Sequence, residues 1–220
     1  MQHNTSSKHS TTQVVRTASG TFYACFSKYD ISCHIETSCD EIFTKLELEM
    51  HQEKHLLHPN KEALMKSFFE GLGCVIIQKK ETGNVVVGFC RLIPLTLHNG
   101  RLWYELGSVF ISNDVRNHGV STGMYEAFLV QHRDKLVLAT TTNPAAIAVG
   151  KKMNFVIIPR RSLPESVWQA SCTCDSAKTM SDSPLTCSLA HQERVSIQPC
   201  YFRVTKETNE ILIRNKTDNI

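Results

Sequence analysis

One stretch of the chain, Tyr104–Val130, has the pattern of a strand, a short polar loop and a helix. The loop carries the residues RNHGVST, with Gly119 just before the expected start of the helix. A glycine-containing loop that leads into a helix leaves several backbone N–H groups free at the positive end of the helix dipole. Arg116, at the start of the loop, adds a planar cation suited to phosphate oxygens. This segment therefore predicts a binding site for a phosphate-bearing cofactor.

Length and charge narrow the classes of protein to consider. The chain has 220 residues, of which 41% are hydrophobic, enough for one domain with a sizeable core. Its net charge of +3 is only mildly basic and does not indicate an obligatory nucleic-acid partner. No run of 18 apolar residues occurs, which argues against a membrane span. The first 20 residues lack the apolar core of a signal peptide, so we expect a cytoplasmic protein.

Apolar spacing in the first half of the chain predicts two helices followed by strands. Ile42, Phe43 and Leu46 have the spacing of a helix with one buried face, and Asn60 can cap a second helix. Asn99-Gly100 is a strong hairpin signal. The expected helices are Asp40–His55 and Asn60–Gly71, and the expected strands are Thr21–Phe26, Cys74–Gln78, Val85–Leu92 and Arg101–Ser112.

The second half of the chain is expected to alternate helices and strands. Asn143 followed by Pro144 is a strong helix start, with a capping side chain and then proline at the first helical position. The expected strands here are Leu136–Thr141, Phe155–Ile158 and Pro199–Thr205. This order predicts an α/β (α+β) fold, with a mixed, mostly antiparallel central sheet flanked by helices.

Composition divides the chain into three parts. Residues 1–20 are expected to form a flexible tail, with an edge strand over Gln13–Arg16 as the alternative. Residues 21–164 are expected to form the core of the domain. Residues 165–220 read as a Cys-rich insert and a C-terminal strand that completes the same domain, and the polar last dozen residues are expected to fray.

Two motifs resemble those of a known family. RNHGVST after a long strand is similar to the acyl-CoA-binding signature of the GNAT superfamily of N-acetyltransferases, and NPAAIAVGKKMNF resembles that family's second signature. The resemblance covers roughly Cys74–Ile158, preceded by two helices in the family's usual order. It implies an acyl-CoA N-acyltransferase fold and transfer of an acetyl group from acetyl-CoA to a primary amine by direct attack in a ternary complex. The acceptor would be a small-molecule or peptide amine, and a homodimer is one possible state.

The resemblance also suggests roles for particular residues. Glu105 falls where several relatives place a catalytic glutamate, and burial against an apolar sheet should raise its pKa. The alternative is an ordinary outward strand residue or a partner for Arg101. Asn143 would touch the pantetheine arm in addition to capping a helix. The expected cofactor-binding residues are Val109, Phe110, Ile111, Arg116, Asn117, His118, Gly119, Val120, Ser121, Thr122 and Asn143, the first three through backbone N–H groups that would also stabilise the developing oxyanion.

The sequence departs from the family's pattern at three positions. Ser121 stands where the family prefers a second Gly or Ala, and Asn154 replaces a Gly that precedes the aromatic Phe155. Gly150 stands where most relatives carry a Tyr that is proposed to protonate the leaving thiolate. These departures motivate an alternative function, a catalytically inactive CoA-binding regulatory module.

The C-terminal cysteines are a separate feature. Cys172, Cys174, Cys187 and Cys200 form a C-x-C-x12-C-x12-C pattern, with His191 as an alternative ligand. Four thiolates, or three and an imidazole, could bind a structural zinc ion. The spacing is not that of a standard zinc finger, so free thiols or disulfides stay as alternatives. If zinc is bound, a zinc-stabilised interaction protein is another possible function.

Overall fold

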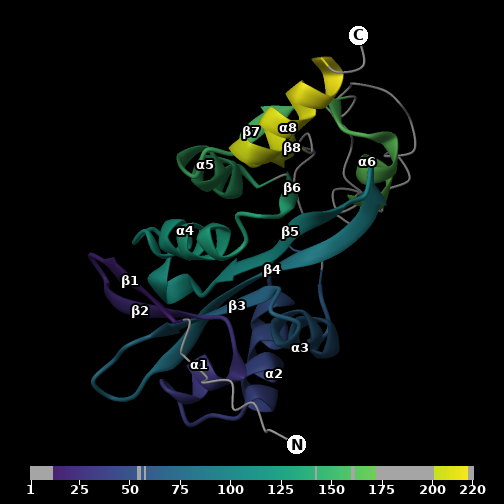
Figure 1. The fold of residues 1–220 in the computed structure, drawn as a ribbon. Helices are drawn as coiled ribbons and strands as arrows, with labels where there is room; N and C mark the ends of the chain where they lie inside the picture. Colours follow the sequence, from purple (N-terminus) through teal and green to yellow (C-terminus); the bar gives the residue numbers. More distant parts are fainter. Residues whose placement is uncertain are drawn as a thin grey trace, which may run out of the picture.

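The fold is described by a computed structural model, which defines residues 12–53, 56, 58–141, 143–159, 162–171 and 201–217. An eight-stranded sheet crosses the molecule in the order β1-β2-β3-β4-β5-β6-β8-β7 (Figure 1). The strands are β1 (Gln13–Thr17), β2 (Gly20–Cys25), β3 (Gly73–Gln78), β4 (Val85–His98), β5 (Arg101–Ile111), β6 (Leu136–Thr141), β7 (Val156–Ile158) and β8 (Tyr201–Val204). The helices are α1 (Lys28–Ser32), α2 (Cys39–Met50), α3 (Lys61–Phe69), the 3-10 turn η1 (Asn113–Val115), α4 (Val120–Gln131), α5 (Pro144–Lys152), α6 (Glu165–Ser171) and α8 (Lys206–Thr217).

The sheet is mixed and mostly antiparallel, as the sequence predicts. β5 and β6 pair in parallel, and the other neighbouring strands of the described sheet pair antiparallel. A parallel pair needs a crossover connection, which α4 provides between β5 and β6. The helix-to-strand order that the sequence predicts from the first helix pair to β7 is confirmed. Individual bounds differ, because α2 ends at Met50 and β4 continues to His98.

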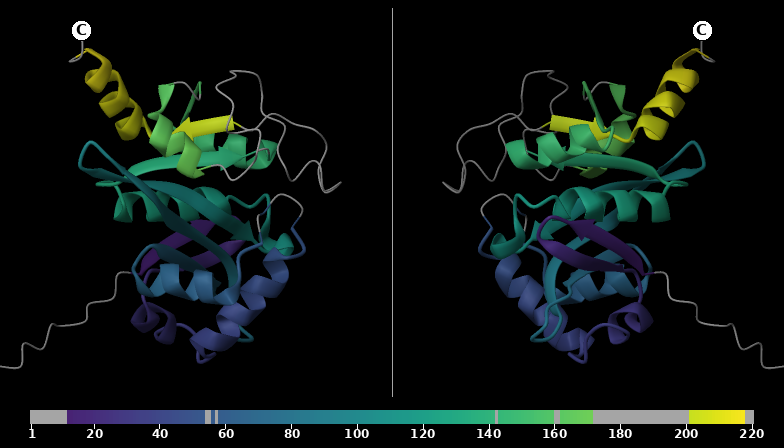
Figure 2. Two further views of the ribbon diagram at one scale, coloured as in Figure 1. Left: turned by 90° about the vertical axis from the view of Figure 1, so that its right-hand side faces the viewer. Right: turned by 90° about the vertical axis from the view of Figure 1, so that its left-hand side faces the viewer.

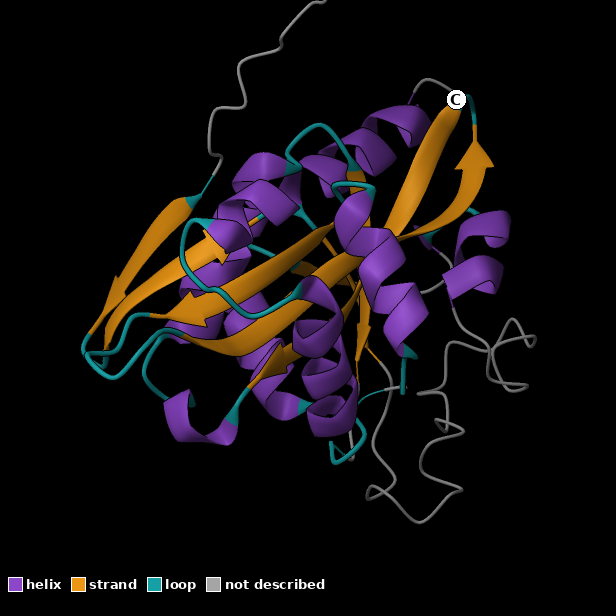
Figure 3. Cartoon of the chain, turned by 90° about the horizontal axis from the view of Figure 1, so that it is seen from below, coloured by secondary structure: helices purple, strands orange, loops and turns teal. Residues whose placement is uncertain are grey.

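Helices cover both faces of the sheet (Figure 3). On one face, α4 packs over the central strands through Met124 and Phe128, and Val149 of α5 joins the same cluster. On the other face, α2 and α3 pack around Phe43 and Phe68. α6 and α8 contribute to a third cluster over β5, β6 and β8. α8 lies at the opposite end of the molecule from α1 and α2 (Figure 2).

Capping side chains begin the helices where the sequence predicts. The Ala63 N–H donates to Asn60 Oδ1 (2.9 Å) at the start of α3, and the Ala145 N–H donates to Asn143 Oδ1 (2.9 Å) at the start of α5. At α2, Ser38 and Glu41 form a capping box. These local contacts fix the helix starts and stabilise each by about 1 kcal/mol.

The expected flexible tail is wrong for residues 13–20. Gln13–Thr17 forms β1, which pairs antiparallel with β2 at the edge of the sheet, so the edge-strand alternative is correct. Tertiary packing explains this, because Val15 sits directly over α4: a Cβ added at Gly123 would lie 2.2 Å from Val15 Cγ1. The predicted domain boundary at residue 21 therefore lies inside a hairpin. Residues 1–11 lie outside the described residues.

The C-terminal segment is also more ordered than expected. The predicted strand is confirmed as β8, but Lys206–Thr217 forms the helix α8 where fraying was expected. The start of α8 is anchored on the sheet, since the Val137 N–H donates to Thr208 Oγ1 (3.1 Å) and the Thr208 N–H donates to Thr205 Oγ1 (3.3 Å). This anchoring depends on β6, so the polar composition of the segment alone could not reveal it.

Candidate active site

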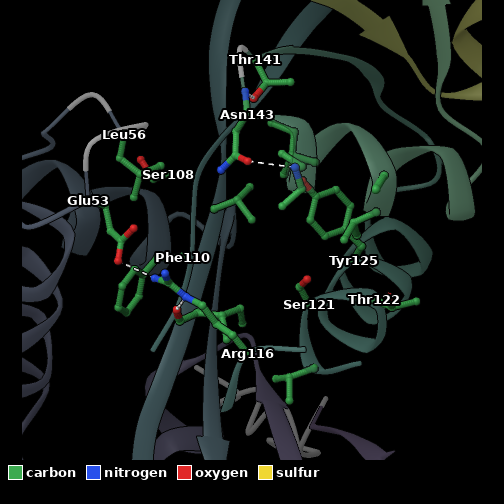
Figure 4. Close-up of a pocket in the computed structure, with 18 of the residues that line it drawn as sticks. Glu53, Leu56, Ser108, Phe110, Arg116, Ser121, Thr122, Tyr125, Thr141 and Asn143 are labelled. Atoms are coloured by element: carbon green, nitrogen blue, oxygen red, sulfur yellow. Dashed lines mark hydrogen bonds and ion pairs between the residues drawn. The ribbon is translucent and has the colours of Figure 1, made fainter. Parts of the chain in front are cut away.

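A cavity opens where β5 and β6 separate. Their parallel pairing covers Trp103 to Glu105 on β5, and β5 then continues to Ile111 without that partner in the described sheet. The space between the two strands forms a cavity of about 490 Å³, closed from one side by α4 and α5 (Figure 4). Beyond Glu105, backbone N–H groups on this edge of β5 have no neighbouring strand in the described sheet to accept their hydrogen bonds, so they are available to a bound molecule.

A bulge in β5 contributes to the separation. Gly107 pairs with Arg91 and Phe110 pairs with Phe89, so two residues of β5, Ser108 and Val109, face one residue of β4. Ser108 has a φ of +51°, a left-handed conformation that is costly for a residue other than glycine. The Arg91 guanidinium holds the bulge by donating to Ser108 Oγ (2.9 Å) and to the Ala63 carbonyl of α3 (2.7 Å).

The loop after β5 presents the start of α4 to the cavity. Gly119 occupies the N-cap position with a φ of +83°, a conformation that glycine adopts at little cost. Because no side chain caps this helix, the first N–H groups of α4 stay free for an anion. Ser121 and Thr122 line the cavity here, together with Asn117. The start of α4 has the free N–H groups that the predicted anion site requires, and binding of an anion here stays a prediction.

Arg116 and His118 are both predicted to bind the cofactor, and the structure shows other surroundings for each. Arg116 lines the cavity, but its Nε donates to the Ile111 carbonyl (2.7 Å) and its Nη2 forms an ion pair with Glu53 of the segment after α2 (Figure 4). Its first role in this structure is to fasten the loop, and a contact with phosphate stays a prediction. His118 is exposed and lies outside the cavity lining.

The predicted oxyanion donors and the predicted pantetheine contact all border the cavity. Val109, Phe110 and Ile111 line one wall along β5. Asn143 lines another wall, where its side chain caps α5 and its own N–H donates to Thr141 Oγ1 (3.0 Å). The structure thus brings residues from β5, the loop, α4 and the start of α5 around one space.

Glu105 is the last residue of β5 that pairs with β6. It therefore lies at the vertex of the opening, the point where the two strands begin to separate. It is half-buried, and Thr140 of β6 donates its Oγ1 hydrogen to the carboxylate. Desolvation raises the pKa of Glu105 to about 7, against the opposing effect of the Thr140 hydrogen bonds. Glu105 is not itself part of the cavity lining, whereas Thr140 is. The ion pairs found among the described residues do not join Glu105 to Arg101, which lies at the start of β5 opposite His98 of β4.

Among the cavity residues for which the sequence predicted no role, Arg203 and Tyr125 are the most relevant to the chemistry. Arg203 of β8 lines it and is only 2% exposed, although β8 lies far from the other lining residues in the sequence. Tyr125 of α4, which the sequence places on a helix with a buried face, also lines it and has a pKa raised to about 12 by desolvation. The spacing of Tyr125 from Ser121 on the same helix was the signal that could have found it.

The predicted zinc ligands Cys172, Cys174, Cys187, Cys200 and His191 lie outside the described residues. Within the described ranges, no group of three or more His, Cys, Asp or Glu side chains is placed to hold a metal ion. The zinc site stays a prediction. Among the helices of the described residues, none has the length and apolar character to cross a membrane.

The family is decided by comparison with known proteins. A model of the acetyltransferase (GNAT) family matches residues 38–155, more than half of the chain. The chain belongs to the GNAT family. The matched range runs from the cap of α2 to Phe155, so it contains the strand separation, the loop and the start of α5. A search of curated protein sequences finds no match.

Solved structures share the GNAT fold at low sequence identity. The NatC complex bound to Gag peptide and CoA includes a chain that is 14% identical, with a TM-score of 0.51 over 76% of this chain and 91% of that one. Arabidopsis thaliana Naa50, in complex with the bisubstrate analogue CoA-Ac-MVNAL, is 12% identical, with a TM-score of 0.50 over 76% of this chain and 93% of that one. The fold predicted from the sequence is therefore confirmed.

Proposed function

We propose that this GNAT protein transfers an acetyl group from acetyl-CoA to a primary amine by direct attack in a ternary complex. One observation carries the proposal: the cavity between β5 and β6 joins an anion-binding helix start at one end to the vertex beside Glu105 at the other. A diphosphate at the start of α4 would direct the pantetheine arm between the strands. Acetyl-CoA supplies the activated acetyl group, and the protein supplies position, a base and hydrogen-bond donors.

The base is needed because an amine with an ordinary pKa is almost wholly protonated at neutral pH. Glu105 suits this role, since its pKa of about 7 leaves roughly half of the carboxyl groups ionised at pH 7. The Thr140 hydroxyl fixes the orientation of the carboxylate. Because Glu105 lies behind the cavity lining, we infer that it accepts the proton either at the vertex or through one water molecule.

The carbonyl oxygen of the acetyl group gains negative charge as the amine attacks. Backbone N–H groups on the free edge of β5 are suited to stabilise that charge, because they are fixed in place before the reaction starts. The bulge residues Ser108 and Val109 line the cavity, together with the neighbouring Gly107. Arg91 stabilises the bulge from the face of the sheet that α3 covers, so we assign it a positioning role.

The acceptor is proposed to be a small-molecule or peptide amine. Peptides occur in the complexes of the two solved relatives, as the Gag peptide of NatC and as the peptide part of the Naa50 bisubstrate analogue. Both relatives share only the fold with this chain, so a peptide N-terminus is one acceptor class to test beside small amines. Arg91 of β4 donates to the Ala63 carbonyl of α3, and Trp103 of β5 packs in one cluster with α6, so we infer that these two helices border the acceptor.

The experiment is a thiol-release screen with acetyl-CoA against peptides with free N-termini, polyamines, amino acids and aminoglycosides. We expect release of CoA with at least one class, and a loss of turnover of about 10²-fold or more in Glu105→Gln. Glu126→Gln, an exposed glutamate of α4, is the matched control and should keep the wild-type rate.

A CoA-binding regulatory module is the second candidate, favoured by Gly150 in the place of the family's tyrosine. It predicts tight CoA binding in calorimetry with no turnover on any acceptor in the screen. Failure of CoA and acetyl-CoA to bind at all would refute both functions, because each depends on the helix start at Gly119.

A further inference from the structure

Arg203 is a buried cation beside the cavity. It lies on β8 and is only 2% exposed, and its Nη1 donates to the Ala146 carbonyl of α5 (2.7 Å). The guanidinium also stacks over the Phe155 ring, with its Cζ 5.6 Å from the ring centroid. Removing a guanidinium from water costs several kcal/mol unless other groups compensate. Since Arg203 also lines the cavity, its charge can act on a molecule bound there.

Arg203 and Gly150 share one space. A Cβ added at Gly150 would lie 2.3 Å from Arg203 Nη1 and 3.4 Å from its Cζ, so any side chain at position 150 would displace the guanidinium. Position 150 is also where the family pattern has a tyrosine. The guanidinium of a distant strand therefore occupies the space beside α5 that a side chain at position 150 would otherwise fill.

Arg203 and Glu105 lie on opposite faces of the sheet at the same point. In the sheet register, Glu105 of β5 is paired with Leu138 of β6, and Arg203 of β8 is paired with Ala139, the next residue of β6. Successive residues of a strand point to opposite faces, and paired residues share a face. The carboxylate and the guanidinium thus flank the vertex of the opening between β5 and β6 from its two sides.

We propose that Arg203 stabilises the CoA thiolate as it leaves during acetyl transfer, an inference that rests on the proposed function. The amine nitrogen attacks the thioester carbon from the Glu105 face and forms the C–N bond. Its proton passes to the Glu105 carboxylate. The C–S bond breaks with its electron pair on sulfur, and the thiolate is held beside the Arg203 guanidinium. Solvent then removes the proton from Glu105 and supplies one to the thiolate.

A guanidinium suits this role because it stays charged at every pH of interest, and it stabilises an anion without giving up a proton. Cations next to a thiol lower its pKa and favour the thiolate. Among the described residues, charged or titratable groups near Arg203 include Tyr125 of α4, the exposed Lys152 at the end of α5, and Glu105 on the other face of the sheet. Tyr125 stays protonated at neutral pH, because desolvation raises its pKa to about 12.

The test compares CoA with desulfo-CoA, in which hydrogen replaces the thiol. Dissociation constants of both are measured by calorimetry from pH 6 to pH 10. If Arg203 lowers the pKa of the bound thiol by about one unit below that of free CoA, the affinity for CoA relative to desulfo-CoA rises toward about tenfold as pH increases. Desulfo-CoA corrects for pH effects on the rest of the site.

Variants assign the effect to the guanidinium. In Arg203→Met we expect the ratio of the two affinities to be independent of pH, and in Arg203→Lys we expect part of the rise to return. Arg133→Met, at the exposed end of α4, is the matched control and should behave as wild type. If Arg203→Met fails to fold, the comparison is made with Arg203→Lys, and a flat wild-type ratio overturns the proposal by itself.

The outcomes separate this inference from the function on which it rests. If desulfo-CoA does not bind to the wild-type protein, the CoA site itself is wrong. If desulfo-CoA binds and the ratio is flat, only the role of Arg203 is refuted. If the ratio rises equally in wild type and Arg203→Met, another group lowers the thiol pKa and the proposal is also overturned.

Discussion

Replacing Glu105 with glutamine should change how the stability of the protein depends on pH. In the folded chain, desolvation raises the pKa of Glu105 from 4.5 to about 7. In the unfolded chain the carboxyl is in water and titrates near its ordinary value. Between these two pH values the unfolded state has lost the proton and the folded state still holds it. Ionisation of Glu105 therefore favours unfolding in this window.

The sign and size of the effect follow from linkage. A group whose folded pKa is raised contributes stability that is fully present below the unfolded pKa and is lost as pH rises through the folded pKa. Each unit of difference in pKa corresponds to about 1.4 kcal/mol. For Glu105 the wild-type protein should lose about 2–3 kcal/mol of stability between pH 5 and pH 8, relative to Glu105→Gln.

The assay is chemical unfolding of both proteins at pH 5, 6, 7 and 8. The quantity of interest is the difference in free energy of unfolding as a function of pH, because the effect of the glutamine itself does not depend on pH. Glu126→Gln is the control, since Glu126 is exposed on α4 and its removal should give a flat difference.

A difference between wild type and Glu105→Gln that stays within about 0.5 kcal/mol from pH 5 to pH 8 would refute the reasoning. That result would mean that water reaches the carboxylate and that its pKa is ordinary. Glu105 would then be mostly ionised at neutral pH simply because it is solvated. Its pKa would no longer support a role as the catalytic base.

Three further changes test other parts of the structure. Thr140→Val removes the hydrogen-bond donor to Glu105 and should move the pH midpoint of the linkage upward; a downward shift would contradict the assigned contact. Gly123→Ala should cost about 1–3 kcal/mol in chemical unfolding, because its Cβ meets Val15, and adding Val15→Ala should recover most of this; no loss would place β1 elsewhere. Asn154 has a φ of +59°, so Asn154→Ala should cost about 1 kcal/mol and Asn154→Gly clearly less; equal costs would argue against this conformation.

Much of the fold could be predicted from local sequence. The cap residues Asn60 and Asn143 act on backbone N–H groups within three residues, so their effect is readable without tertiary contacts. The apolar run of β3 and the glycine of the loop are similarly local. The uncapped start of α4 belongs to this class, because it needs only Gly119 and the helix that follows it.

Other elements depended on partners far away in the chain. β1 is a short polar strand that becomes ordered by pairing with β2 and by packing of Val15 on α4. α8 begins on a hydrogen bond between Thr208 and the backbone of β6. Composition alone predicted a tail and a frayed end for these segments, since it contains no information about which surface will cover them.

The sequence by itself determined the strand–loop–helix unit, the helix caps and the family, because these depend on neighbours within a few residues of one another. Tertiary structure alone decided the bulge at Ser108, the size of the pKa shift of Glu105 and the position of Arg203 beside Gly150. The bulge forms where β4 and β5 pair, and the other two results depend on segments that lie far apart in the chain. Desolvation and steric exclusion are properties of the packed sheet, and no single segment carries them.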